Sequence, residues 1–152
     1  MKHFQTIMLA SSITLLTFTS PAIQAHGDEP VASKARHGGQ VRVAGANNFE
    51  LVVAKVSNNT KDNPIIVFVT DRAGTNVSTV GASGTATILA GKTKATVPLV
   101  PDGDNRLKGT ADVASTADMK VVVSIALAGK ANEQVRFAPL AIEKPENSGH
   151  KH

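Results

Sequence analysis

The chain contains no cysteine, tyrosine or tryptophan, and each absence excludes a kind of protein. Without cysteine we expect no disulfide framework, no lipoprotein anchor and no thiol nucleophile, so a folded domain must depend on its packed interior alone. Aromatic residues make up only 3% of the sequence. That scarcity disfavours the stacking platforms that bind nucleic-acid bases or sugars.

A long apolar run is also missing. The stretch Ile7–Phe18 is shorter than the ~20 residues that a membrane-spanning helix needs, and it follows a short basic start and precedes a proline and several small residues. This layout is typical of a secretory signal peptide, so we expect residues 1–25 to be removed by cleavage after Ala25, with Ala22 as the competing site. The mature protein is then expected in the periplasm, without membrane insertion.

Charge of one sign is in only slight excess. The sequence has 16 Lys and Arg against 12 Asp and Glu, for a net charge of +4, and the charged residues are scattered rather than gathered into a block. So weak an excess argues against a nucleic-acid partner and is compatible with simple solubility. After signal removal about 127 residues remain, which is the usual size of one domain.

The sequence from Gln40 onward alternates β-branched runs with Gly, Asn and Asp clusters about every ten residues, and no segment has helical periodicity. We therefore predict an all-β fold: a single antiparallel β-sandwich, immunoglobulin-like or similar, of about seven to nine strands between Gln40 and Leu140. The domain is expected to span residues 37–142. The polar segments 26–36 and 143–152 are expected to be flexible tails.

Several strands can be predicted individually. Met119–Leu127 alternates most clearly, and Ile65–Val69 is apolar on both faces, as expected for a strand at the centre of the core. Residues 40–44 and 49–56 should form a hairpin around the turn Gly45–Asn48. In the strand that contains Ala95, Val97 and Leu99, Pro98 indicates an edge position because proline cannot donate to a ladder. A last strand surrounds Val135 and Phe137.

The histidines are the most informative residues for function. Those that remain after processing are His26, His37, His150 and His152, and all lie outside the predicted strands. Imidazole is a common ligand for zinc, copper and nickel, so these side chains are candidate metal ligands. The ordinary alternative for His150 and His152 is a solvated histidine in a polar tail, and it is the favoured one.

His37 differs because it stands directly before Gly38-Gly39 and the first strand. A hairpin would bring Glu50, which interrupts an apolar strand, back towards His37, and a metal ion shared between imidazole and carboxylate would satisfy that carboxylate. The alternative is that Glu50 faces solvent and pairs with Arg42 across the hairpin.

His26 offers a separate possibility. Cleavage after Ala25 would give it a free α-amine beside its imidazole, and the two nitrogens could chelate Cu(II), with His37 as a further ligand. The alternative is that a histidine merely happens to follow the cleavage site.

The segments His37-Gly38-Gly39, Glu50-Leu51-Val52 and Val67–Asp71, together with Asn105–Gly109 and Val121–Ser124, resemble a small periplasmic β domain associated with heavy-metal efflux adaptor subunits. The resemblance covers roughly residues 37–138. It implies metal handling through His37 and perhaps Glu50, with an envelope or efflux-complex protein as partner. The coiled-coil hairpin and lipoyl-like segment of full-length adaptors are absent from this sequence.

Catalysis has little support, because there is no Gly-x-Ser-x-Gly elbow and no cysteine nucleophile. We predict no catalytic residues. The leading hypothesis is a periplasmic accessory protein for metal efflux or resistance that binds a divalent transition metal: copper, zinc or nickel. Its rival is a non-catalytic structural or protein-interaction module of the cell envelope.

Overall fold

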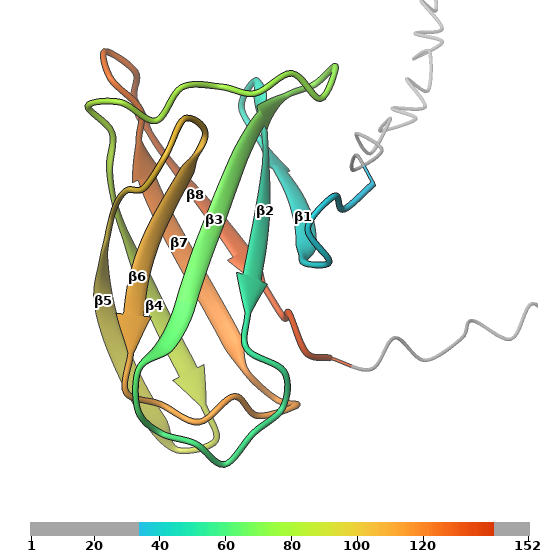
Figure 1. Cartoon of the computed structure of the whole chain (residues 1–152), viewed down its shortest axis with the longest axis vertical. Helices are drawn as coiled ribbons and strands as arrows, with labels where there is room; N and C mark the ends of the chain where they lie inside the picture. Colours follow the sequence, from blue (N-terminus) through green and yellow to red (C-terminus); the bar gives the residue numbers. More distant parts are fainter. Residues whose placement is uncertain (1–33, 142–152) are drawn as a thin grey trace, which may run out of the picture.

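The computed structural model describes residues 34–141, and this part of the chain forms eight β-strands and no helix (Figure 1). The strands are β1 (Gln40–Ala44), β2 (Asn47–Val53), β3 (Asn63–Asp71), β4 (Ser83–Ala90), β5 (Thr93–Pro101), β6 (Arg106–Ala111), β7 (Lys120–Ala126) and β8 (Asn132–Phe137). The predicted signal peptide and C-terminal tail lie outside the described residues. Within residues 34–141, no helix exists that could cross a bilayer.

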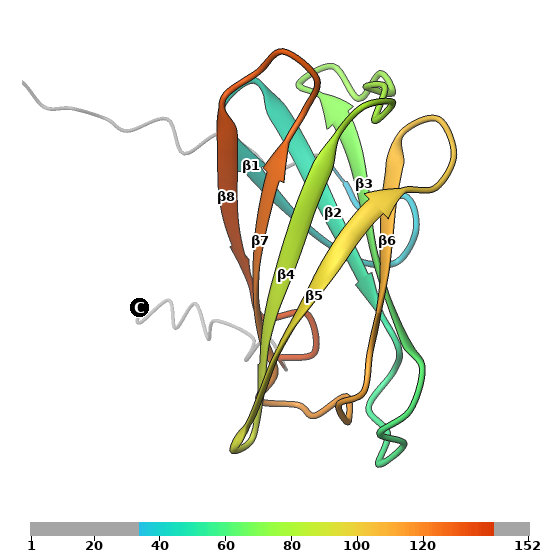
Figure 2. The same ribbon diagram turned by 90° about the vertical axis from the view of Figure 1, so that its left-hand side faces the viewer.

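All eight strands belong to one sheet, with the order β1-β2-β3-β6-β5-β4-β7-β8, and every neighbouring pair is antiparallel. The sheet rolls up so that β1-β2-β3-β6 faces β5-β4-β7-β8 across the interior, as the two views show (Figures 1 and 2). The predicted all-β class, antiparallel pairing and number of strands are therefore confirmed, and the rolled sheet has nearly the shape of a barrel.

The two edge strands of the described sheet, β1 and β8, lie side by side where the roll closes (Figure 2). One side-chain bond joins β1 to the residue that follows β8, and a second joins the start of β2 to β8. The Gln40 side-chain oxygen accepts a hydrogen bond from the Ala138 N–H at 2.8 Å, and Asn47 Nδ2 donates to Glu133 Oε2 at 3.3 Å.

The core fills the space between the two halves with fully buried alternate residues from β2 to β8, and Ala44 of β1 packs against it while partly buried. Val67 on β3 and Val123 on β7 are both fully buried, one from each half. Burying such a side chain contributes roughly 1.5–3 kcal/mol relative to leaving it exposed. The predicted alternation of the β7 region is confirmed, since its inward residues are all buried: Met119, Val121, Val123, Ile125 and Leu127.

The predicted β1–β2 hairpin is present, but its turn is shorter than expected. Because β2 begins at Asn47, only Gly45 and Ala46 connect the strands, and Gly45 has the positive φ of 52° that a two-residue hairpin turn needs. The strand also ends at Val53 rather than at Val56.

The edge position predicted from Pro98 is wrong for β5, which has a neighbour on each side. However, β5 pairs with β6 only at Val100 and Pro101, whereas it pairs with β4 from Thr93 to Leu99. Pro98 therefore lies in the part of β5 that pairs with β4 but not with β6. The absence of its backbone N–H therefore costs little hydrogen bonding.

Candidate functional site

The candidate site lies on the outer surface of the sheet, where residues 36–39 cross it just before β1. We call these four residues the N-terminal strap. Beneath it, Glu50 points outward from β2, with Val41 of β1 and Phe68 of β3 as its cross-strand neighbours. The strap leaves Glu50 only 7% exposed. A carboxylate buried among apolar neighbours has to be compensated by hydrogen bonds.

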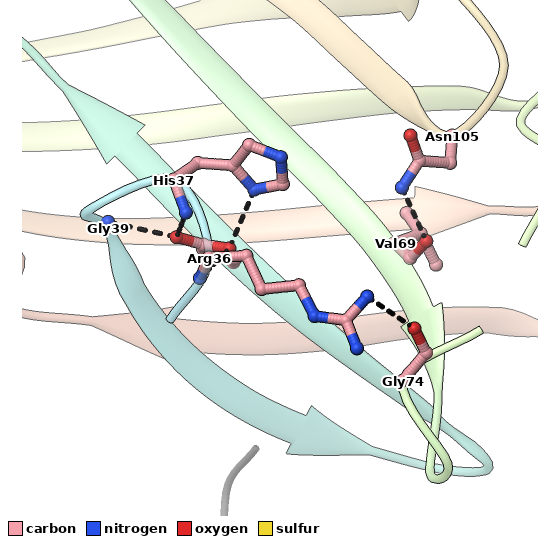
Figure 3. A network of polar contacts seen from close by, with 7 residues as sticks. Arg36, His37, Gly39, Val69, Gly74 and Asn105 are labelled. Atoms are coloured by element: carbon pink, nitrogen blue, oxygen red, sulfur yellow. Dashed lines mark hydrogen bonds and ion pairs between the residues drawn. The ribbon is translucent and has the colours of Figure 1, made fainter. Parts of the chain in front are cut away.

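The strap supplies those bonds (Figure 3). Glu50 Oε1 accepts from the backbone N–H groups of His37 at 2.7 Å and Gly39 at 3.0 Å. Oε2 accepts from the Arg36 N–H at 3.1 Å and bonds His37 Nδ1 at 2.9 Å. Both carboxylate oxygens are thus engaged twice, and all four of these bonds from the strap converge on one side chain of the sheet.

These bonds determine the protonation of Glu50. Burial alone raises the pKa of its carboxyl group, but the hydrogen bonds from Gly39, the His37 ring and the N–H groups of His37 and Arg36 outweigh burial and hold the pKa below its ordinary value. Glu50 is therefore ionised at neutral pH. An ionised carboxylate can only accept, so His37 Nδ1 must carry a hydrogen.

The His37 ring is oriented from two directions. It lies flat on the Phe68 ring, with 3.6 Å between centroids and 4° between planes, while Glu50 fixes its Nδ1 edge. In the neutral ring a hydrogen on Nδ1 leaves Nε2 with a free lone pair, on the side away from Glu50 (Figure 3). The side chain is 40% exposed. This arrangement matches that of a metal-ligating histidine whose other nitrogen is held by a carboxylate.

The Gly-Gly pair after His37 is required by the path of the strap. Gly38 has a φ of 76°, which L side chains rarely adopt. At Gly39, a β-carbon would overlap the carbonyl of Leu51 on β2, so only glycine allows its N–H to approach Glu50. The strap's other end is tied to the loop after β3, where Arg36 Nη1 donates to the Gly74 carbonyl at 2.7 Å.

A small, partly open cavity of about 20 Å³ remains under this part of the chain. Its walls are Lys34, Arg36, His37, Val41, Asn48, Glu50, Phe68, Thr70 and Gly74. A cavity of that size holds a single water molecule, whereas pockets for small organic ligands are more than tenfold larger. The site is therefore suited to an ion or a water rather than to an organic substrate.

The structure brings together two of the residues singled out from the sequence, His37 and Glu50. The alternative pairing of Glu50 with Arg42 is wrong, because Glu50 lies opposite Val41 and neighbouring residues of a strand point to opposite faces. Arg42 Nη1 instead donates to the Val41 carbonyl. The predicted ligands His26, His150 and His152 lie outside the described residues.

Sequence reasoning missed Phe68, Arg36 and Gly74 as neighbours of the site. Phe68 carried a signal, because it occupies an outward position of an apolar strand and so needs a cover. Arg36 and Gly74 carried none, since their contact joins two loops that lie 38 residues apart.

The described residues contribute few metal donors. Between residues 34 and 141, no three His, Cys, Asp or Glu side chains lie close enough together to hold a metal ion. His37 Nε2 fits the role of ligand, whereas both Glu50 oxygens are already used for hydrogen bonding. Comparison with known proteins adds no further guide, since no family model matches the chain and no significant match is found among curated proteins or solved structures.

Proposed function

We propose that this chain is a non-catalytic periplasmic protein that binds a divalent transition metal, copper, zinc or nickel, with His37 as its central ligand. The observation that carries the proposal is the 2.9 Å bond between His37 Nδ1 and Glu50 Oε2. That bond fixes the ring and leaves Nε2 with the lone pair that a metal needs. A role as an accessory to metal efflux or resistance, with an envelope protein as partner, follows from the resemblance stated above.

In this proposal Glu50 orients His37 rather than binding the metal. Its four hydrogen bonds would have to be broken before an oxygen could serve as a ligand. The other ligands would come from histidines outside the described residues. His26 with its α-amine is the first choice, because a short segment joins it to the strap, and His150 and His152 are the second.

We also infer that the rolled sheet is best treated as a β-sandwich. Its two layers would be β1-β2-β3-β6 and β5-β4-β7-β8, joined where β5 and β6 meet at Val100 and Pro101. This view is supported by the seam between β1 and β8, where no ladder joins the two strands and the Gln40–Ala138 hydrogen bond crosses between them instead.

The second candidate function is that of a structural or protein-interaction module. The observation that favours it is that the N–H groups of Arg36, His37 and Gly39 all donate to Glu50. A carboxylate that holds three backbone amides in place has a structural role, and the His37 ring would then only add a fourth hydrogen bond to that carboxylate.

Titration calorimetry separates the metal-binding proposal from the interaction-module proposal. It uses the protein that begins at His26, with Cu(II), Zn(II) and Ni(II). If His37 is a ligand, His37→Ala should weaken binding at least about tenfold and Glu50→Gln should weaken it about 10- to 100-fold through the misplaced ring. A single extra residue before His26 shows whether the α-amine contributes, because the added residue converts that amine into an amide. Loss of binding only when residues 143–152 are removed would refute the His37 site and leave the interaction module ahead.

A further inference from the structure

The outer surface of the second half of the sheet has an unusual charge distribution. On β4, β5, β7 and β8, residues alternate between the core and the outside, and no outward position on these strands carries Asp or Glu. The charged outward residues are Lys94, Lys120 and Arg136, and all are exposed. We call this surface the cationic face.

The strand register places the cations together. Leu89 of β4 lies directly between Lys94 of β5 and Lys120 of β7, so the two lysine Cα atoms are about 10 Å apart, two strand spacings. Arg136 of β8 lies across from Val122, the next outward position along β7. Asp118, which interacts with Lys120, borders the face just before β7. These three cations therefore reach solvent on one side of the rolled sheet.

Hydroxyl and amide groups occupy much of the remaining surface. Thr87 and Thr96 are bonded through their hydroxyls at 3.2 Å, and Asn132 Nδ2 donates to Ser124 Oγ at 2.8 Å. Ser124 and Asn132 also line a shallow hollow of about 210 Å³ with Ser83, Gly84 and Thr85. These groups can both donate and accept hydrogen bonds.

We propose that the cationic face binds an acidic polysaccharide through charge and hydrogen bonding rather than through ring stacking, with the lysines and Arg136 contacting its anionic groups and the hydroxyl and amide side chains contacting its sugar hydroxyls. Charge complementarity selects a polyanion, and the many hydroxyl and amide groups select one rich in hydrogen-bonding groups. Long side chains spread over β5, β7 and β8 can contact a linear polymer at several points. The site is independent of His37, which lies on the opposite half of the sheet.

Two other kinds of partner suit this face less well. Protein interfaces are depleted in lysine, whereas two of the three charged outward residues on these strands are lysines. Peripheral membrane binding needs a buried apolar surface, but Leu89 and Val100 are the large hydrophobic residues that are well exposed here, and they lie on different strands.

The test is binding of the whole protein to immobilised alginate, a carboxylated polysaccharide, with neutral dextran as the comparison surface. The test variant is Lys94→Gln/Lys120→Gln/Arg136→Gln. The matched control, Lys55→Gln/Lys61→Gln/Arg72→Gln, removes the same charge from exposed positions in the loops on either side of β3, on the other half of the sheet. We expect the test variant to lose at least about tenfold in affinity and the control less than about twofold, with binding weakening as salt rises from about 50 to 200 mM. Circular dichroism melting verifies that both variants fold.

Each other result would overturn the proposal. An equal loss in both triple variants would mean that only net charge matters, and no loss in either would mean that the face is not used. Equal binding to dextran would exclude recognition of the anionic groups. Tighter binding to vesicles of anionic phospholipid, weakened by Leu89→Ser, would show that a bilayer is the partner instead.

Discussion

The two halves of the rolled sheet share one interior but have different exteriors. The outer surface of β1-β2-β3 is largely apolar, with Val41, Ile66 and Phe68 half-buried, and the N-terminal strap lies across part of it. The outer surface of β5-β4-β7-β8 carries hydroxyls, amides and cations and has no such cover within the described residues. A covered apolar exterior can bury a functional carboxylate, whereas a bare polar one can only present groups to solvent. The two surfaces are therefore suited to different ligands.

The largest expected effect concerns the hydrophobic core, which the two halves of the sheet share. Replacing Val67 by Asp places a charge without a partner in the fully buried centre of the first half, and we expect a loss of more than about 4 kcal/mol in the free energy of unfolding. Val123→Asp in the second half should cost as much, while Thr85→Asp on the bare exterior should change it by less than about 0.5 kcal/mol. Urea unfolding measures all three. Cooperative melting like that of the wild type in either valine variant would mean that this core is wrongly assigned.

The next effect concerns the covered exterior of the first half, where the contribution of Glu50 to stability should depend on pH. Since the pKa of Glu50 lies below its ordinary value of 4.5 when folded, its ionised form stabilises the fold above that value, and the contribution is lost as the pH falls through the lowered pKa. Glu50→Gln should therefore be about 2 to 3 kcal/mol less stable at neutral pH, and the gap should close in acid. Urea unfolding at a series of pH values tests this. A stability difference between the wild type and Glu50→Gln that stays constant down to pH 3 would contradict a stabilising role for the Glu50 charge.

The smallest effect compares one outward residue from each half. Phe68→Ala removes the surface on which His37 stacks and should cost about 1 to 2 kcal/mol, less than for a fully buried phenylalanine. Val122→Ala, an outward change on β7, should cost less than about 1 kcal/mol. Hydrogen exchange sharpens the comparison, since the amides of His37 and Gly39 should exchange faster only in the Phe68 variant. Equal exchange in both variants would mean that the ring contact does not hold the strap.

Much of the fold could be predicted from the sequence because most strands follow a strict alternation. β3 and β7 were predicted from their β-branched runs, and β1–β2 from its hairpin turn. β4 and β6 were not identified individually, because their inward positions include small residues such as Ala86, Gly109 and Ala111, which give little hydrophobic contrast. The curvature that nearly closes the sheet depends on contacts between distant strands and has no local signal.

The juxtaposition of His37 and Glu50 was predicted from the hairpin and from one acid in an apolar strand. The role of Glu50 as the acceptor that holds the strap was not predicted. Three of its four hydrogen bonds come from backbone N–H groups, which every residue except proline carries. The geometric need for Gly39 appears only when β2 is in place, since the obstacle is the Leu51 carbonyl. The residues of the His37-Gly38-Gly39 motif can thus be recognised from the sequence, but the reason that Gly39 must be glycine lies on the neighbouring strand β2.

The side-chain bridges at the seam have a consequence for self-association. Edge strands with unpaired backbone groups are templates on which another copy can add a strand, and they are a common origin of aggregation. Here the two edges of the described sheet, β1 and β8, lie against each other: Gln40 of β1 bonds to Ala138 just after β8, and Asn47 at the start of β2 bonds to Glu133 of β8. Each edge blocks access to the other, so we expect the folded domain to resist edge-to-edge polymerisation at high concentration for as long as its packed interior keeps the sheet rolled.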